Sequence, residues 1–163
     1  YKQGKNAMEF NKNKELQKEY NDEIARKTWH YQKEFGFEVV TIDVNEDGVV
    51  TPEMLNAVMD NKTILVSIMA VNNETGSINP IKELSKVVHS FPKAIFHSDT
   101  TQAIGKLNLD YSCIDAFVMS GHKIEGLKGS GCLVIKKGIN LLPIILLLAW
   151  KTSRLVDIRN III

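Results

Sequence analysis

Short apolar stretches that alternate with amphipathic ones constrain the fold of this chain more than any other feature. Residues 63–69, TILVSIM, are almost continuously apolar, which is typical of a strand covered on both faces of a sheet. Thr51 and Pro52 form a helix N-cap and a first helical position, followed by an apolar stripe at helical spacing. Asn79 and Pro80 open a second predicted helix. The other predicted strands lie at residues 37–43, 94–98, 115–119 and 131–135. This alternation predicts an α/β fold with a mostly parallel sheet and flanking helices.

The charge balance and the apolar content limit the classes of partner. The 163 residues include 20 basic and 19 acidic side chains, for a formal net charge of +1, so no global field favours nucleic acid or a membrane surface. Residues 141–150, LLPIILLLAW, are about half the length that crosses a bilayer, so a buried strand or helix is predicted there. Two cysteines and no visible signal peptide favour the cytoplasm, or the matrix of an organelle such as the mitochondrion.

Two partial motifs fail at a position that their chemistry requires. Residues 43–54, DVNEDGVVTPEM, resemble a calcium loop, but Met54 stands where a bidentate glutamate should be, so a polar turn is predicted. Gly121 and Gly126 have the spacing of a phosphate-binding loop, but Leu127 replaces the lysine that must follow the second glycine. His30 and His97 have no cysteine or carboxylate at ligand spacing, so no zinc site is predicted, and no residue is assigned to a metal.

Polar residues follow three predicted strands at the ends where ligands bind in parallel α/β sheets. We call them the edge cluster: Asn72, Asn73, Asp99, Gln102, Ser120, His122 and Lys123. Taken singly, Asp99 would be a helix N-cap and Lys123 a solvated lysine. Together they suit pyridoxal 5′-phosphate, because a carboxylate keeps its ring nitrogen protonated and a lysine amine bonds to its aldehyde carbon. Hydroxyl, imidazole and backbone N–H groups suit the phosphate.

The same part of the chain resembles the cysteine desulfurases of the class V aminotransferase group, which are fold type I enzymes that depend on pyridoxal phosphate. The resemblance lies in three segments, VSIMAVNNETGSINPI, FHSDTTQAIGKLNLD and VMSGHKIEGLKGSGCLVI, and covers residues 36–145. It implies that this region is part of the large domain of a pyridoxal-phosphate-dependent transferase.

The resemblance also implies a role for each site residue. The cofactor-binding residues that it implies are Asn73, Asp99, Gln102, Ser120, His122 and Lys123. Lys123 would be the catalytic lysine that links to the cofactor, and Asp99 would pair with the pyridine nitrogen. Gln102 would hydrogen-bond the ring hydroxyl, Asn73 would support the ring and the substrate, and the serine and histidine before the lysine would bind the phosphate.

The activity that the resemblance implies is the conversion of L-cysteine to L-alanine, with sulfur passed to a loop cysteine for iron–sulfur cluster assembly. Members of the family are homodimers, and a sulfur-acceptor or scaffold protein is a further expected partner.

The ends of the chain depart from the family pattern. Residues 1–35 match poorly and read as a charged segment that is helical or partly disordered, whereas 146–163 form a divergent tail. Neither Cys113 nor Cys132 matches the cysteine that accepts sulfur. The chain is therefore expected to be a truncated desulfurase-like module, weakly active or inactive alone. Two alternatives stay open: a non-catalytic remnant that binds a partner, and another fold type I enzyme such as a selenocysteine lyase or an aminotransferase.

Overall fold

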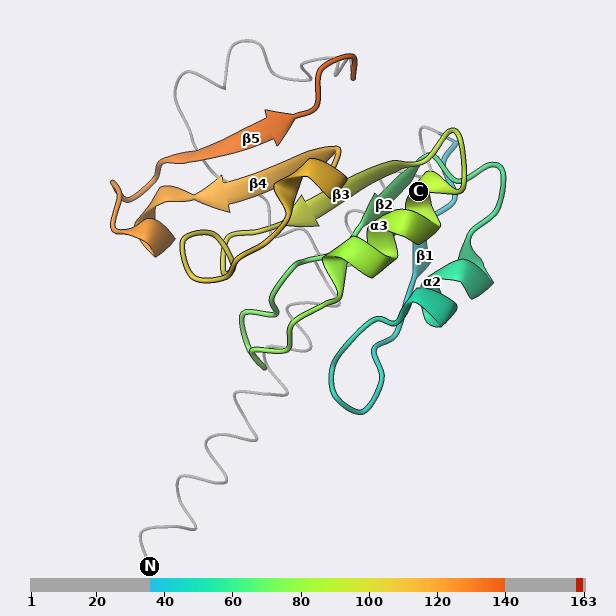
Figure 1. The fold of residues 1–163 in the computed structure, drawn as a ribbon, viewed down its shortest axis with the longest axis horizontal. Helices are drawn as coiled ribbons and strands as arrows, with labels where there is room; N and C mark the ends of the chain where they lie inside the picture. Colours follow the sequence, from blue (N-terminus) through green and yellow to red (C-terminus); the bar gives the residue numbers. More distant parts are fainter. Residues whose placement is uncertain (1–35, 140–160, 163) are drawn as a thin grey trace, which may run out of the picture. The chain divides into compact units, whose positions relative to one another are not determined.

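The computed structural model describes residues 36–139 and Ile161–Ile162 (Figure 1). The chain divides into two compact units, residues 1–39 and 40–163, and all the described helices and strands belong to the second unit. The predictions made for 1–35, for LLPIILLLAW and for most of the C-terminal tail lie outside the described residues.

A six-stranded sheet forms the centre of the second unit, with the strand order β1-β6-β2-β3-β4-β5. The strands are β1 (Val40–Thr41), β2 (Leu65–Ser67), β3 (Ile95–Asp99), β4 (Ala116–Ser120), β5 (Gly131–Ile135) and β6 (Ile161–Ile162). Strands β2, β3 and β4 are parallel neighbours, while β5 is antiparallel to β4, and β6 is antiparallel to β1 and β2. Four strands thus run in one direction, which confirms the predicted mostly parallel sheet.

The connections explain the strand directions. The chain crosses from β2 to β3 through helix α3 (Ile81–His89), as parallel neighbours require. Residues 121–130, which include a short 3₁₀ helix, return the chain from the end of β4 to the adjacent β5, and these two strands are antiparallel. The predicted strand at 37–43 is too long, because only Val40–Thr41 pairs, and its partner β6 has two residues.

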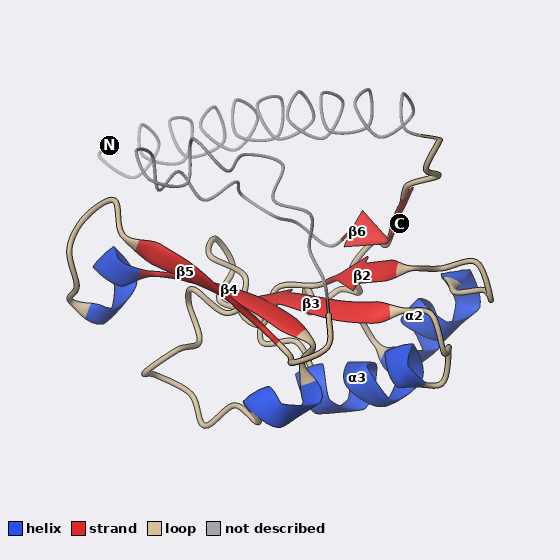
Figure 2. Ribbon diagram, turned by 90° about the horizontal axis from the view of Figure 1, so that it is seen from above, coloured by secondary structure: helices blue, strands red, loops and turns tan. Residues whose placement is uncertain are grey.

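Two α-helices cover one face of the sheet (Figure 2). Helix α2 (Pro52–Val58) begins as predicted, since Thr51 Oγ1 accepts a hydrogen bond from the Met54 N–H at 3.3 Å. Helix α3 begins at Ile81 after an N-cap at Pro80 that makes no side-chain cap bond. Asn79 precedes this helix but does not cap it.

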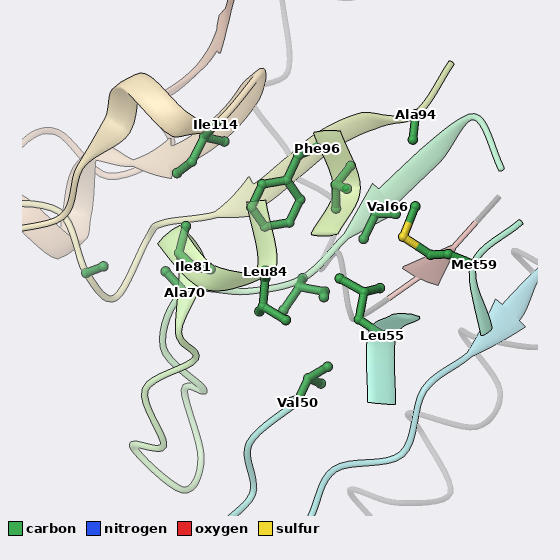
Figure 3. Close-up of a cluster of buried hydrophobic side chains, with 13 residues drawn as sticks. Val50, Leu55, Met59, Val66, Ala70, Ile81, Leu84, Ala94, Phe96 and Ile114 are labelled. Atoms are coloured by element: carbon green, nitrogen blue, oxygen red, sulfur yellow. The ribbon is translucent and has the colours of Figure 1, made fainter. Parts of the chain in front are cut away.

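The main core lies between these helices and the sheet (Figure 3). Phe96 of β3, Leu55 of α2 and Leu84 of α3 are fully buried there, and Val66 of β2 lies beside Phe96 in the strand register. Side chains alternate between the two faces of a strand. The neighbours of Val66 and Phe96 along their strands therefore face the other side of the sheet, and the site described below depends on this arrangement.

The segment that resembles a calcium loop is a polar turn, as predicted. Asn45 Oδ1 accepts hydrogen bonds from the N–H groups of Asp47 at 3.1 Å and Val49 at 2.9 Å, and Gly48 adopts a φ of 74°. Among the residues that the structure describes, no helix is long and apolar enough to cross a membrane.

Candidate functional site

The edge cluster lies where three parallel strands end. Strand β3 ends at Asp99 and β4 ends at Ser120. The loop after β2 joins the same edge, because the Ala70 N–H donates to the Asp99 carbonyl oxygen at 2.8 Å. This is the edge at which parallel α/β sheets bind ligands.

Asp99 has one carboxylate oxygen engaged and one available. Oδ1 accepts a hydrogen bond from the Thr101 N–H at 2.8 Å, so Asp99 caps the turn that follows, as a helix N-cap would. Its other oxygen has no hydrogen-bond partner within residues 36–139. The next residue, Thr100, is fully buried and donates from Oγ1 to the Val118 carbonyl oxygen at 2.9 Å, which fixes the end of β3 against β4. Gln102 is half-buried in the same turn.

The lysine follows β4 on a short 3₁₀ helix, η2 (Gly121–Ile124). Ser120 is buried, and its Oγ lies 2.7 Å from His122 Nδ1. His122 and Lys123 are both exposed. The Lys123 amine makes no ion pair or hydrogen bond with any described residue, so it is available to a ligand.

The glycines around Lys123 close a loop too tight for side chains. A Cβ added to Gly121 would overlap Ser130 Oγ, and one added to Gly126 would lie 2.9 Å from the Gly121 carbonyl oxygen. The Gly126 N–H donates to that oxygen at 2.8 Å, and the Gly121 N–H donates to the Ser130 carbonyl oxygen, also at 2.8 Å. A Cβ at Gly126 would therefore collide with backbone, whereas one at Gly121 would collide mainly with the Ser130 side chain, so the loop that carries Lys123 favours glycine at both positions.

The third loop of the cluster carries two asparagines with different surroundings. Asn72 Oδ1 accepts from the N–H groups of Glu74 at 2.8 Å and Thr75 at 3.0 Å, so it shapes the turn. Asn73 is exposed and available to a ligand. The loop is anchored at its far end by Asn79.

Asn79 is a buried residue whose role the sequence did not reveal. Its Oδ1 accepts from the Val50 N–H at 2.8 Å, and its Nδ2 donates to the Met69 carbonyl oxygen at 2.8 Å. It thereby ties the end of β2 to the segment before α2. Asparagine before proline is a common turn signal, and nothing in the local sequence distinguishes this use of it.

His97 is a second residue that the sequence analysis missed. It is buried on β3, and its Nδ1 lies 2.8 Å from Ser67 Oγ on β2. Burial lowers the pKa of His97, and the negative charge of Asp99 opposes this. The alternation of the strand gave a usable signal, because it places His97 on the same face of the sheet as Asp99.

A separate polar network lies at the C-terminal end of α3. His89 Nε2 lies 2.8 Å from Asp115 Oδ2, and Lys136 Nζ lies 3.3 Å from Asp115 Oδ1. Ser85 Oγ is 3.2 Å from His89 Nδ1, which gives an arrangement of serine, histidine and aspartate. Ser85 is buried, however, and its hydroxyl donates to the Cys113 carbonyl oxygen at 2.7 Å, so this network joins structural elements and does not activate a nucleophile.

Of the two cysteines, Cys113 is a poor candidate for a reactive thiol. Burial raises the pKa of the Cys113 thiol, and its Sγ donates to the Asp110 carbonyl oxygen at 3.0 Å. Cys132 is half-buried in β5, opposite Met119 of β4. The described residues contain no group of three or more His, Cys, Asp or Glu side chains that could hold a metal ion.

The donor set of the edge cluster fits pyridoxal phosphate. One carboxylate oxygen of Asp99 is available for a ring N–H, and the Lys123 amine is free. The paired side chains of Ser120 and His122 lie beside a glycine loop that leaves no room for a Cβ, so backbone N–H groups and polar side chains are close together there.

The part of the chain that carries the edge cluster is similar in sequence to known proteins. A family model described as aminotransferase class-V matches residues 7–144. The NifS/IcsS protein homolog of Lactobacillus delbrueckii subsp. bulgaricus is 45% identical over 112 residues, which cover 67% of this chain and 29% of that protein. The cysteine desulfurase IscS of Dictyoglomus turgidum is 40% identical over 118 residues, which cover 71% of this chain and 30% of that protein.

A solved structure is also similar to this chain over most of its length. The structure of SspA in complex with cysteine is 30% identical, with a TM-score of 0.68 over 73% of this chain and 35% of that one. This chain therefore spans less than a third of the length of the two curated relatives and little more than a third of the solved structure.

Proposed function

Because this chain belongs to the aminotransferase class-V family, whose members depend on pyridoxal phosphate, we propose that it is the cofactor-binding module of a cysteine desulfurase. Its substrate is L-cysteine. The C–S bond of the substrate breaks as its sulfur passes to an acceptor thiolate other than Cys113 or Cys132, which becomes a persulfide, and the protonated remainder leaves as L-alanine. The observation that carries the proposal is that Asp99, Ser120 and Lys123 lie at the ends of adjacent parallel strands or directly after them.

Each residue of the edge cluster has a distinct task in this proposal. Lys123 would hold the cofactor through its amine. Once the substrate amine has replaced it there, the released Lys123 amine would take and return a proton at the substrate Cα. Asp99 accepts a hydrogen bond from the ring N–H and keeps that nitrogen protonated. When bound, the protonated ring acts as an electron sink for the negative charge that develops on the substrate. Ser120 and His122 bind the phosphate, and Gln102 hydrogen-bonds the ring hydroxyl.

The substrate assignment rests on chemistry and on similarity together. The exposed Asn73 lies on the loop after β2 and is suited to contact the cofactor ring and the amino acid. A solved structure similar to this chain is a complex with cysteine. We further propose that the thiol that accepts the sulfur is neither Cys113 nor Cys132. Burial raises the pKa of Cys113, which keeps it protonated at neutral pH, whereas the nucleophile in sulfur transfer is a thiolate.

Cofactor binding is tested by adding pyridoxal phosphate to the purified chain and recording the visible absorption of the lysine-bound cofactor. The matched variants are Lys123→Ala and Lys128→Ala, two exposed lysines of one loop. The band is expected in the wild type and in Lys128→Ala, and it should be absent in Lys123→Ala. A missing band in the wild type, or a band that survives Lys123→Ala, would overturn the assignment.

The reaction is tested separately with cysteine as the substrate. Alanine and sulfide are measured after L-cysteine is added to the cofactor-loaded chain in the presence of a thiol reductant. Formation of alanine that depends on Lys123 and persists in the Cys113→Ser/Cys132→Ser double variant would support both the substrate and the excluded cysteines. Binding of the cofactor with transamination of other amino acids, and no alanine from cysteine, would replace the desulfurase by an aminotransferase.

A further inference from the structure

A buried histidine two residues before Asp99 has one ring nitrogen without a partner. His97 is 7% exposed, and Nε2 is buried with no hydrogen-bond partner among the described residues. Its other nitrogen, Nδ1, lies 2.8 Å from Ser67 Oγ. Buried polar atoms in folded proteins are nearly always paired, so an unpaired one points to a water or a ligand that completes it.

The geometry of β3 places His97 on the same side of the sheet as Asp99. Side chains alternate along a strand, so His97 and Asp99 face one side of the sheet, while Phe96 faces the helices. Ser67 is the register partner of His97 on β2 and shares its face. The rise of a strand separates the Cα atoms of His97 and Asp99 by about 6.5 Å. An imidazole and one bridging atom can span that distance.

The protonation state of the His97 ring decides which group donates the hydrogen bond toward Asp99. A neutral imidazole carries one N–H, and Ser67 can donate its hydroxyl proton to Nδ1, which leaves the proton on Nε2. Burial keeps the ring neutral by lowering the pKa of His97, whereas the Asp99 charge favours a donor that faces it. A neutral donor supports the Asp99 carboxylate without cancelling its charge, so Asp99 keeps its ability to pair with a cationic ring.

We propose that His97 is a positioning residue of the cofactor site: Ser67 orients its ring, and Nε2–H is hydrogen-bonded through one water to Asp99, which it holds in place for the pyridine nitrogen. His97 does not touch the cofactor in this arrangement and acts through Asp99 alone. The inference rests on the proposed function only where it assigns the cofactor to Asp99.

The test is a double-mutant cycle on the affinity for pyridoxal phosphate, measured by spectral titration of the full chain. His97→Leu removes the donor and should raise the dissociation constant about tenfold, the cost of one hydrogen bond to a charged group. His97→Gln keeps an N–H donor and should retain most of the affinity. In an Asp99→Asn background, His97→Leu should change the dissociation constant by less than about twofold, because the group through which it acts is gone.

Two results would overturn the proposal. One is an unchanged affinity in His97→Leu; the other is an equal loss in the wild-type and Asp99→Asn backgrounds, which would mean that His97 only supports the fold. Thermal melts identify variants that do not fold. If His97→Leu does not fold, His97→Phe, which also lacks the donor, replaces it in the cycle with the same expected loss.

A cofactor-free measurement separates this inference from the proposed function. The ring of His97 is titrated by NMR in the wild type and in Asp99→Asn. If His97 interacts with Asp99 as proposed, the pKa of His97 should be lower in Asp99→Asn, and the ring proton of the wild type should be on Nε2. If the wild type binds no pyridoxal phosphate, the proposed function fails, while this titration still decides the link. The same pKa in both proteins would refute it.

Discussion

Nε2 of His89 on α3 lies 2.8 Å from Oδ2 of Asp115, the residue that directly precedes β4. The same oxygen accepts a hydrogen bond from the Phe96 N–H at 2.9 Å, and Oδ1 is 3.3 Å from Lys136 Nζ. Asp115 therefore joins α3, β3 and the end of β5 through one carboxylate whose side chain is 10% exposed. Because Phe96 and Asp99 belong to the same strand, this contact helps to hold the strand that carries the site.

Removal of the Asp115 carboxylate should destabilise the fold strongly. Asp115→Ala leaves a buried N–H and a histidine without their partner, and we expect a loss of about 2–4 kcal/mol in the free energy of unfolding. The matched control is Asp47→Ala, an exposed aspartate whose side chain makes no hydrogen bond with the described residues, with an expected change within about 0.5 kcal/mol. Urea unfolding of the three proteins gives the comparison. Equal stability of both variants would show that the network is dispensable.

The pH dependence of stability should show two separate windows. Burial alone would raise the pKa of Asp115, but hydrogen bonds from the Phe96 N–H and His89, and the contact with Lys136, outweigh it and lower the pKa. The ionised carboxylate then stabilises the fold above its ordinary pKa of about 4, and this contribution is lost as the pH falls through the lower folded-state pKa.

His97, whose pKa burial lowers, is held neutral in the fold. The unfolded chain takes up its proton first, so stability should begin to fall below about pH 6.5 and level off below the folded-state pKa.

Urea unfolding between about pH 8 and pH 3 would separate these windows. His97→Leu should flatten the upper window and leave the lower one, whereas Asp115→Ala should flatten the lower window. A wild-type curve without slope between pH 6.5 and pH 5 would contradict the buried neutral histidine.

The sequence predicted the elements whose signal is local. Strand β5 has the predicted bounds at Gly131–Ile135, and Thr51 caps α2 as expected. The resemblance to cysteine desulfurases is confirmed by the relatives, and the mixed, mostly parallel sheet follows from the order of strands and helices. These predictions depend on residues close together in the chain.

The contacts that the sequence did not predict join residues far apart in the chain. Asn79 accepts a hydrogen bond from Val50, which is 29 positions away, and His97 forms a hydrogen bond with Ser67, which is 30 positions away. No periodicity encodes such pairs, because they depend on which strands become neighbours. The roles given to the edge cluster remain predictions, although the structure places its loops at one end of the sheet.

The tight loop around Lys123 predicts a specific cost for a single methyl group. Gly121→Ala would place a Cβ against Ser130 Oγ, and we expect it to weaken pyridoxal-phosphate binding and to lower the free energy of unfolding by about 1–3 kcal/mol. Ser130→Ala removes that oxygen, so the double variant should recover part of both losses. Spectral titration and urea unfolding measure them. If Gly121→Ala costs the same with and without Ser130 Oγ, the overlap is not the cause.

Two asparagines of the loop after β2 should separate binding from stability. Asn79→Ala leaves the buried Val50 N–H and the Met69 carbonyl oxygen without the side chain that now pairs with them, and should cost about 2–3 kcal/mol. Asn73→Ala changes an exposed side chain, so stability should stay within about 0.5 kcal/mol while the affinity for pyridoxal phosphate falls. Thermal melts measure the stability of both variants, and spectral titration measures their affinity for pyridoxal phosphate. A stable Asn79→Ala, or an Asn73→Ala with wild-type affinity, would show that the anchor or the ligand contact has been assigned to the wrong residue.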